Sequence, residues 1–392
     1  MEKHCSMILI GPAFPYRGGI SETQHQFASA LVQKGCNIQL WTFTTLYPRF
    51  LFPGSSQYSS DSTNNGLNAL RKVHAYNPKN WKIIAQEINY INPQVVVFRY
   101  YTPYLSFCYW GIMKYLNQKI LRIGFVDNWI AHEKRWIDGL LNQLFGKGID
   151  KFSAFSENVA SEIASSIHSK PIWYAQHPIA KDLPPKMQKT KARKQLGWNV
   201  SSHIVLFYGI IRKYKGLDLL LKSLSRDLLD SKNIELKIVG DCYQKKTYYR
   251  HLIQKKNLEQ KIQCYFEFAD QSMTQLVFSA ADLLVLPYRS TSQSGIIPLS
   301  YHYDLPLVVS NVKGIAQIIQ KDQTGFISEN FPNDISQKIV TALQKENLIH
   351  FKTNISRCKK SYDWDDFTEK WLAYVDSNEP QTQPKKIFSD DT

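Results

Sequence analysis

The sequence predicts an α/β fold of two doubly wound parallel-sheet domains that face each other across a cleft. Short apolar strands alternate with amphipathic helices along most of the chain, which is typical of parallel sheets with helices on both faces. A Pro- and Lys-rich segment at 178–199 interrupts the alternation once, and the pattern then starts again. The chain has 392 residues, enough for two such cores. Because ligands of these sheets bind beyond the carboxyl ends of the strands, the loops there are the first candidates for function.

The first half opens with a strand–loop–helix–strand unit. Residues 7–10 form an apolar run that ends at Gly11-Pro12, apolar residues then recur at helical spacing, and residues 37–43 alternate like a strand. We expect strands at 7–10, 37–43, 95–98, 121–126, 152–155 and 171–174, and helices at 21–33, 81–88, 109–117 and 158–166.

The second half repeats the same alternation after the interruption. We expect strands at 203–208, 235–239, 262–266, 283–286 and 307–309, and helices at 216–224, 248–256, 271–279, 333–345 and 365–377. The interrupting segment contains a short basic cluster at 186–194 and few apolar residues, so it is expected to connect two domains.

Composition and charge narrow the classes of partner. The formal charge is +15, which favours nucleic acid, an anionic membrane surface or an anionic small substrate. The sequence has no helix-turn-helix, RNP or zinc-finger spacing, so a phosphorylated ligand or anionic lipid is the better expectation. The six cysteines are scattered and read as reduced thiols, with no metal site. With neither a transmembrane-length apolar run nor a signal-peptide pattern, we expect a cytoplasmic protein.

The loop after the first strand, GPAFPYRGG, places Gly18 and Gly19 at the mouth of the following helix. Glycines there let backbone N–H groups approach an anion. The spacing is that of neither a dinucleotide fingerprint nor a P-loop. The alternative is an ordinary turn that needs a positive φ angle.

The loop GIIRKYKG follows the first strand of the second half and contains three cations, Arg212, Lys213 and Lys215. Cations before a helix start oppose the helix dipole, an arrangement that an anion between them would relieve. A pyrophosphate fits, because Arg binds two oxygens side by side and Lys supplies a point charge. The alternative is a set of solvated surface cations.

A third loop, at 287–295, lies between two apolar runs and is rich in small hydroxyl residues. Its sequence RSTSQSG provides neutral hydrogen-bonding groups, and Gly295 is expected to open the next helix. Such groups bind phosphate or sugar oxygens without adding charge, and an ordinary helix cap explains them equally well.

These stretches occur in an order that resembles a known family. FPYRGG, YGIIRKYKGLDLLLKSL, AADLLVLPYRS and LPLVVSNVKGIAQII are similar to segments of the retaining family-4 glycosyltransferases of the GT-B fold, and the resemblance covers residues 7 to 375. It implies an N-terminal acceptor-side Rossmann-like domain at 1–180, a linker at 181–200, a C-terminal nucleotide-sugar-binding domain at 201–355, a helix at 356–378 that packs back on the N-terminal domain and a flexible tail at 379–392.

The resemblance also implies roles for individual residues. The donor-phosphate cations of the family match Arg212 and Lys215, although the arginine falls two positions later than in the common pattern. A family histidine near the donor sugar matches His132, so the expected catalytic residues are His132, Arg212 and Lys215. The expected donor-binding residues are Gly18, Gly19, Gly209, Arg212, Lys215, Glu267, Phe268, Gln293, Ser294, Gly295 and Ile296.

The chain departs from the family at the third loop. Family members carry two glutamates there at a fixed spacing, whereas this chain has Ser292, Gln293 and Ser294 near the first position and Leu299 or Ser300 at the second. It resembles a Thr/Ser-Gln-Ser-Gly branch in which neutral groups replace the carboxylates. Because of this departure, the identity of the donor sugar is not predicted. The chain could also be a weakly active or inactive paralogue that binds a nucleotide sugar. A GT-B epimerase is a further alternative, although the loop is poor in the acid and base groups that it would need.

The expected reaction is transfer of a sugar from a nucleotide-sugar co-substrate to a glycan or lipid-linked glycan, with retention, in cell-surface polysaccharide synthesis. No cofactor and no metal are expected, since Asp363-Trp-Asp365 reads as a helix cap. The stretches LWTFTTLYPRFLFPG and RYYTPYLSFCYWGIMKYLNQK mix aromatic and basic residues. They predict either core elements or a face for peripheral contact with the anionic inner membrane.

Overall fold

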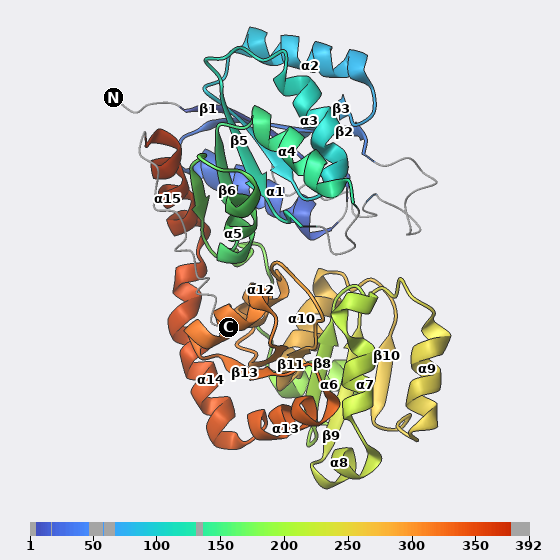
Figure 1. Ribbon diagram of the computed structural model, residues 1–392. Coiled ribbons are helices and arrows are strands. Elements are labelled where there is room, and N and C mark those ends of the chain that lie inside the picture. The colour runs from blue at the N-terminus through green and yellow to red at the C-terminus, as the bar shows by residue number, and fades with distance from the viewer. Residues whose placement is uncertain (1–4, 17, 47–57, 59–66, 131–135, 378–392) are drawn as a thin grey trace, which may run out of the picture. The chain divides into compact units, whose positions relative to one another are not determined.

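The computed structural model describes residues 5–16, 18–46, 58, 67–130 and 136–377. Within these residues the chain forms two α/β units (Figure 1). The N-terminal unit contains the chain up to His177 and again from Trp364, and the C-terminal unit runs from Pro178 to Asp363.

The N-terminal unit is built on a seven-stranded sheet in which every neighbouring pair is parallel. The strand order is β3-β2-β1-β4-β5-β6-β7, so the order reverses between β1 and β4. The strands are β1 (Ser6–Ile10), β2 (Asn37–Thr45), β3 (Ala69–His74), β4 (Val95–Tyr100), β5 (Leu121–Val126), β6 (Lys151–Ala154) and β7 (Ile172–Tyr174).

Helices cover both faces of this sheet, because successive side chains of the buried strands point to opposite sides. On β1, Ile8 and Ile10 join the core beneath α2, α3, α4 and α5, whereas Met7 and Leu9 join the core beneath α1 and α15. The helices are α1 (Gly19–Gln33), α2 (Pro78–Ile91), α3 (Ser106–Met113), α4 (Asp138–Gly148), α5 (Glu157–Ser166) and α15 (Trp364–Asp376).

The C-terminal unit has a six-stranded sheet, again with parallel neighbours, in the order β10-β9-β8-β11-β12-β13. The order reverses between β8 and β11. The strands are β8 (His203–Tyr208), β9 (Ile234–Val239), β10 (Ile262–Tyr265), β11 (Leu283–Leu286), β12 (Leu307–Ser310) and β13 (Gly325–Ser328).

Two cores again lie on opposite faces of the sheet. On β8, Val205 and Phe207 join the core on one face, and Ile204 and Leu206 join the core on the other. The helices are α6 (Lys189–Leu196), α7 (Leu217–Ser223), α8 (Arg226–Ser231), α9 (Lys246–Lys255), α10 (Gln271–Ala280), α11 (Ile296–His302), α12 (Lys313–Asp322), α13 (Pro332–Ala342) and α14 (Lys345–Cys358).

The predicted fold class, two doubly wound parallel sheets, is confirmed, and the expected cleft stays a prediction. Every strand expected from the sequence is present within a residue or two, while β3 and β13 were not expected. β3 reads ALRKVH and lies at the edge of its sheet with Arg71 exposed, so it lacks the continuous apolar run of a buried parallel strand.

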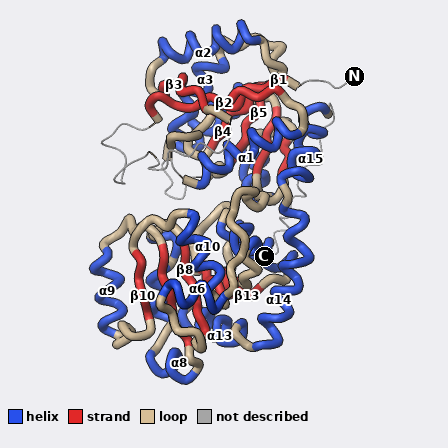
Figure 2. Tube along the Cα trace, turned by 180° about the vertical axis from the view of Figure 1, so that it is seen from behind, coloured by secondary structure: helices blue, strands red, loops and turns tan. Residues whose placement is uncertain are grey.

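The linker expected at 181–200 is not a loose connection. Residues 189–196 form α6, which packs beside α10 within the C-terminal unit (Figure 2). The physical reason is Arg193, whose side chain is only 2% exposed and bonds to several groups of the sheet. The charge run therefore contains one buried cation among solvated ones.

The last described helix belongs to the N-terminal unit. α15 begins at Trp364, directly after Asp363, and packs against α1 (Figure 2). The Trp371 ring meets the Phe27 ring edge-on at 4.9 Å, and its indole nitrogen donates to Ser153 Oγ at 2.8 Å. The chain thus rejoins the first unit at Trp364, eight residues later than the expected start at 356.

Candidate functional site

The candidate site lies at the carboxyl ends of β8 and β11, the pair of strands where the order of the second sheet reverses. Open α/β sheets bind ligands at such a reversal because the two flanking loops diverge there. The loop after β8 contains Gly209, Arg212 and Lys215, and the loop after β11 contains Gln293 and Ser294. The fold therefore brings the second and third loops of the sequence prediction together.

The two cations of the β8 loop differ in exposure. Arg212 is exposed, and its guanidinium carbon lies 5.0 Å from the centre of the Tyr243 ring. Lys215 is half-buried in the short helical turn before α7, and its Nζ donates to the Tyr288 hydroxyl at 2.6 Å. Burial, together with the charge of Arg212, lowers the pKa of Lys215 to about 7.

No salt bridge among the described residues joins Arg212 or Lys215 to a carboxylate. The nearest acid on the following helix, Asp218, is occupied by Arg289, whose guanidinium donates to both carboxylate oxygens at 2.8 Å. Burial raises the pKa of Asp218, but the hydrogen bonds and charge of Arg289 outweigh that effect, so its pKa lies below the usual range. Among the described residues, no carboxylate therefore neutralises the charge of Arg212 or Lys215.

Arg289 also fixes the shape of the cation loop. Its backbone N–H donates to the Tyr214 carbonyl at 2.7 Å, and its Nη1 donates to the Lys213 carbonyl at 2.8 Å. Gly216 adopts φ +71°, and a Cβ there would lie 1.8 Å from the Pro287 carbonyl oxygen. Only glycine allows the two loops to pack this closely.

The hydroxyl-rich loop after β11 is largely enclosed. Ser292 is 5% exposed and Ser294 is 7% exposed. Gly314 of α12 packs directly against the Thr291 and Ser292 backbone, where a Cβ would come within 2.5 Å. The Ser294 hydroxyl is buried and has no hydrogen-bond partner among the described residues. Tyr288, at the start of the same loop, is buried as well, and burial raises its pKa above the ordinary value. Its hydroxyl accepts from Lys215 Nζ, so this tyrosine connects the loop to the cation loop.

Other expected donor-binding residues flank this pair of loops. A Cβ on Gly209 would lie 3.0 Å from Ile296, the first residue of α11, and Gly295 caps that helix as expected. Glu267 and Phe268 are exposed after β10, two strands away from β8. The structure therefore brings Gly209, Ile296 and the two loops together, whereas Glu267 and Phe268 lie two strands away at the outer end of the same sheet edge.

Three expected site residues, Gly18, Gly19 and His132, belong to the N-terminal unit and not to the unit that contains the two loops. Gly18 caps α1 with φ +112° and Gly19 is the first residue of that helix. A Cβ on either would meet no atom within 4 Å. His132 lies outside the described residues. The parts that these three residues play stay predictions.

Sequence reasoning missed Tyr288, Arg289 and Asp218. Tyr288-Arg289 directly follows Pro287 at the end of β11, and its position beside the hydroxyl-rich loop was the available signal. Across the described residues, no group of three or more His, Cys, Asp or Glu side chains could hold a metal ion.

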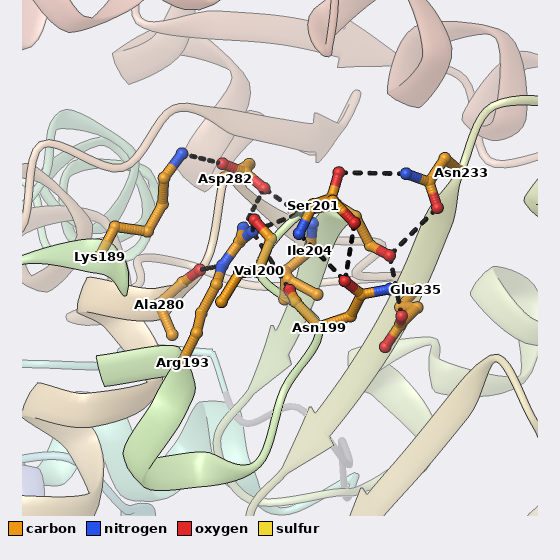
Figure 3. A network of polar contacts seen from close by, with 11 residues as sticks. Lys189, Arg193, Asn199, Val200, Ser201, Ile204, Asn233, Glu235, Ala280 and Asp282 are labelled. Carbon is orange, nitrogen blue, oxygen red and sulfur yellow. Dashed lines mark hydrogen bonds and ion pairs between the residues drawn. The ribbon is translucent and has the colours of Figure 1, made fainter. Parts of the chain in front are cut away.

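A second polar network lies at the opposite, amino edge of the same sheet (Figure 3). Arg193 of α6 donates to the carbonyl oxygens of Ala280, Val200 and Ser202 at 2.9 Å and to Asp282 at 2.6 Å. Asp282 also accepts from Lys189 and from the Ile204 N–H, each at 2.8 Å. Burial raises the pKa of Asp282, but Lys189, Arg193 and the Ile204 N–H together lower it below the usual range. This network is internally satisfied and leaves no group for a ligand.

Comparison with known protein families identifies the class of the C-terminal unit. Residues 188–357 match the model of the family described as Glycosyl transferases group 1. This part of the chain is therefore similar to a glycosyl transferases group 1 domain. An uncharacterized glycosyltransferase of Methanocaldococcus jannaschii is 22% identical over 187 residues. The match covers 47% of this chain and 47% of that protein, so the chain spans about half the length of this curated relative.

Solved structures similar to the whole chain define the fold. Sucrose-phosphate synthase from Thermosynechococcus elongatus superposes with a TM-score of 0.73 at 14% identity, covering 95% of this chain and 98% of that one. A glycosyltransferase from Rickettsia africae gives 0.72 at 17% identity, covering 95% and 98%. HepE of Anabaena, in complex with UDP and glucose, gives 0.72 at 12% identity, covering 95% and 99%. The two parallel-sheet units therefore have the GT-B fold.

Proposed function

We propose that this protein is a retaining glycosyltransferase that moves a sugar from a nucleoside-diphosphate sugar to an acceptor hydroxyl. The observation that carries the proposal is the pair Arg212 and Lys215, which has no carboxylate salt bridge among the described residues and lies at the sheet reversal of a group 1 domain. A diphosphate supplies the opposing charge, and its oxygens match the donors of an arginine and a lysine.

The chemistry follows from where charge develops. Cleavage of the bond between sugar and phosphate builds negative charge on the departing diphosphate. Arg212 and Lys215 stabilise that charge as it grows, which lowers the barrier rather than only tightening substrate binding. In the proposed reaction the departing phosphate accepts the acceptor's proton on the same face of the sugar, so retention needs no protein nucleophile.

In this proposal the two loops bind different parts of the donor. The cation loop takes the diphosphate, and the hydroxyls at 292–294 hydrogen-bond the phosphate or sugar oxygens that family members hold with glutamates. The similar structure of HepE contains UDP and glucose, so UDP and UDP-glucose are the first ligands to try. The nucleotide and sugar of this chain are left to the experiment.

Nucleotide binding tests the donor site. The melting temperature should rise with one of UDP, GDP, ADP or dTDP, because a ligand that binds only the folded state stabilises it by mass action. In the double variant R212A/K215A, the affinity for that nucleotide should fall by about a hundredfold or more, since each charge-assisted hydrogen bond contributes about 1.5–3 kcal/mol.

The matched control is K213A, which removes an exposed cation of the same loop and should change the affinity little. Equal affinities in wild type and double variant would refute the donor site. Product analysis with the corresponding nucleotide sugars then separates the alternatives. Transfer supports the proposal, epimerised sugar indicates the epimerase, and binding without turnover indicates the inactive paralogue.

We further propose that the acceptor is a glycan or lipid-linked glycan reached at an anionic membrane surface, through one helical face of the N-terminal unit. On and beside α3, whose place in the fold is labelled in Figure 1, four aromatic residues are each at least 36% exposed: Tyr104, Phe107, Trp110 and Tyr115. The other residues of α3, including Cys108, Tyr109 and Ile112, are buried. Lys114 Nζ lies 5.6 Å from the Trp110 ring centre. Exposed aromatic residues flanked by lysines suit the interface of an anionic bilayer.

The earlier stretch LWTFTTLYPRFLFPG contributes less to this proposal. Its first seven residues belong to β2 or follow it and are largely buried, and residues 47–57 lie outside the described residues. No helix in the described part of the chain is long and apolar enough to span a bilayer.

Vesicle flotation tests the surface. The protein should float with phosphatidylglycerol-rich vesicles and less with pure phosphatidylcholine, and F107S/W110S should reduce the floated fraction severalfold. Phe331, an exposed aromatic of the C-terminal unit, provides the control F331S, which should float like wild type. Absence of flotation with anionic vesicles at moderate salt would rule this surface out.

A further inference from the structure

Tyr288 connects the two loops of the candidate site and has no role in the prediction from sequence. It follows the last residues of β11, its side chain is 0% exposed, and its hydroxyl accepts a hydrogen bond from Lys215 Nζ at 2.6 Å. The Lys215 Nζ also lies 4.0 Å from the centre of the Tyr288 ring. The tyrosine thus contacts the buried cation through both its ring and its hydroxyl.

Protonation fixes the direction of this hydrogen bond. A lysine ammonium can only donate, so the Tyr288 oxygen accepts from Lys215. The phenol keeps its own proton, because burial raises its pKa. The remaining protons of the Lys215 ammonium can then be donated to a ligand oxygen while Tyr288 holds the nitrogen in place.

The other groups around Lys215 do not provide a comparable partner. Arg212 repels the ammonium, the Tyr214 ring centre lies 5.5 Å from Nζ, and the adjacent Asp218 is held by Arg289. The Tyr288 hydroxyl is therefore the group in the described structure that both fixes Nζ in place and stabilises its charge before any anion binds.

We infer that Tyr288 is a positioning residue for the donor diphosphate, which holds Lys215 Nζ in place for the ligand. The inference rests on the proposed function and adds one residue to the proposed donor site. Where the paired glutamates are absent, the tyrosine hydroxyl orients the lysine without adding a negative charge next to the diphosphate.

The experiment is calorimetric titration of wild type, Y288F and Y303F with whichever of UDP, GDP, ADP and dTDP gives the largest thermal shift. Y288F keeps the ring and removes only the hydroxyl. Tyr303 is an equally buried tyrosine of the same unit, and its hydroxyl has no hydrogen-bond partner in the described structure, so Y303F is a matched control. We expect Y303F to bind like wild type and Y288F to bind about three- to tenfold more weakly, the effect of one lost hydrogen bond.

Proton uptake gives a readout that a merely structural role would not change. The pKa of Lys215 in the free protein is about 7, and a bound diphosphate raises it, so binding near pH 7 should take up about half a proton. Removing the phenol oxygen lowers the pKa of the free lysine further, so Y288F should take up closer to one proton. Titration in two buffers of different ionisation enthalpy measures this number.

The outcomes separate the inference from the proposed function. If wild type binds none of the four nucleotides, the proposed function fails. If wild type binds one and Y288F matches Y303F in both affinity and proton uptake, the inference alone is overturned. Should Y288F fold poorly, a crystal structure of wild type with the bound nucleotide is the test. Lys215 Nζ within hydrogen-bond distance of both the Tyr288 hydroxyl and a diphosphate oxygen supports the inference, and a lysine turned away from Tyr288 contradicts it.

Discussion

The two edges of the C-terminal sheet hold cations in opposite ways. At the amino edge, Arg193 is surrounded by three backbone carbonyls and the carboxylate of Asp282 at 2.9 Å or less (Figure 3). At the carboxyl edge, Lys215 is half-buried with a phenol oxygen as its hydrogen-bond partner and another cation, Arg212, nearby. The hydrogen-bond partners of these two cations, and not their charge, distinguish Arg193, which the protein neutralises, from Lys215, which we propose binds a ligand.

The electrostatic consequence follows from the same contacts. Burial of a charge is unfavourable unless hydrogen bonds and an opposite charge compensate it. Arg193 has that compensation within the protein. Lys215 lacks a carboxylate partner, and its pKa falls to about 7. The amino edge stabilises the fold, and the carboxyl edge holds an uncompensated charge that a diphosphate can neutralise.

The largest expected effect comes from breaking the compensated edge. D282N keeps the side-chain size but leaves the Arg193 charge buried without its carboxylate, and should reduce the free energy of unfolding by about 3–5 kcal/mol. Urea denaturation measures it. K189M removes the half-exposed partner of the same carboxylate and should cost less than about 1 kcal/mol. If the two variants lost equal stability, Arg193–Asp282 would not be the structural pair described here.

A smaller effect is expected where the two loops of the site meet. Gly216 and Gly197 have similar left-handed angles, φ +71° and +66°, but a Cβ on Gly197 would meet no atom within 4 Å. G197A should therefore lose only the conformational term, about 1–2 kcal/mol. G216A adds the clash with Pro287 and should lose at least about 1 kcal/mol more, together with nucleotide affinity. Equal losses in thermal unfolding would show that the loops need not pack this closely.

The smallest expected change in stability is a gain, and it comes from replacing Lys215. The folded pKa of Lys215, about 7, lies below its ordinary value of 10.5, so between these values the unfolded state binds more protons. This group therefore destabilises the fold increasingly as the pH falls from about 10.5 to about 7. K215M should stabilise the free protein by about 1–3 kcal/mol near pH 7.

The gain in K215M should shrink as the pH rises towards 10, because the lysine of wild type is then neutral in both states. Denaturant titrations of the two proteins at several pH values test this. At the same time K215M should bind nucleotide more weakly and take up no proton from this site. A destabilised K215M at every pH would mean that Lys215 serves the fold.

Local patterns were enough to predict most strands of both sheets and to bring the cation loop and the hydroxyl-rich loop to the same edge of one sheet. Apolar runs such as 203–208 are buried strands whatever their neighbours, and the ends of parallel strands meet at one edge. The contacts that decide the chemistry are distant in sequence. Lys215 meets Tyr288, 73 positions later, and Arg193 meets Asp282, 89 positions later.

The same limit explains why residues 181–200 were interpreted as a linker, although part of this segment forms α6. In the cluster at 186–194 the buried Arg193 and the exposed lysines around it form one run of positive charge, and the burial of Arg193 depends on contacts with residues distant in sequence, such as Asp282. The strand β13 was missed for a related reason. Its four residues, GFIS, are too few to show a periodic pattern. It also begins with a glycine, which the packing requires because a Cβ at Gly325 would lie 1.9 Å from the Leu307 carbonyl oxygen.

The most direct measurement of the central claim is a crystal structure of the full chain with UDP or another nucleoside diphosphate that shifts its melting temperature. Our account predicts diphosphate oxygens within hydrogen-bond distance of the Arg212 guanidinium and Lys215 Nζ, with the Tyr288 hydroxyl still bound to that lysine. A nucleotide bound elsewhere, with both cations turned to solvent, would contradict it.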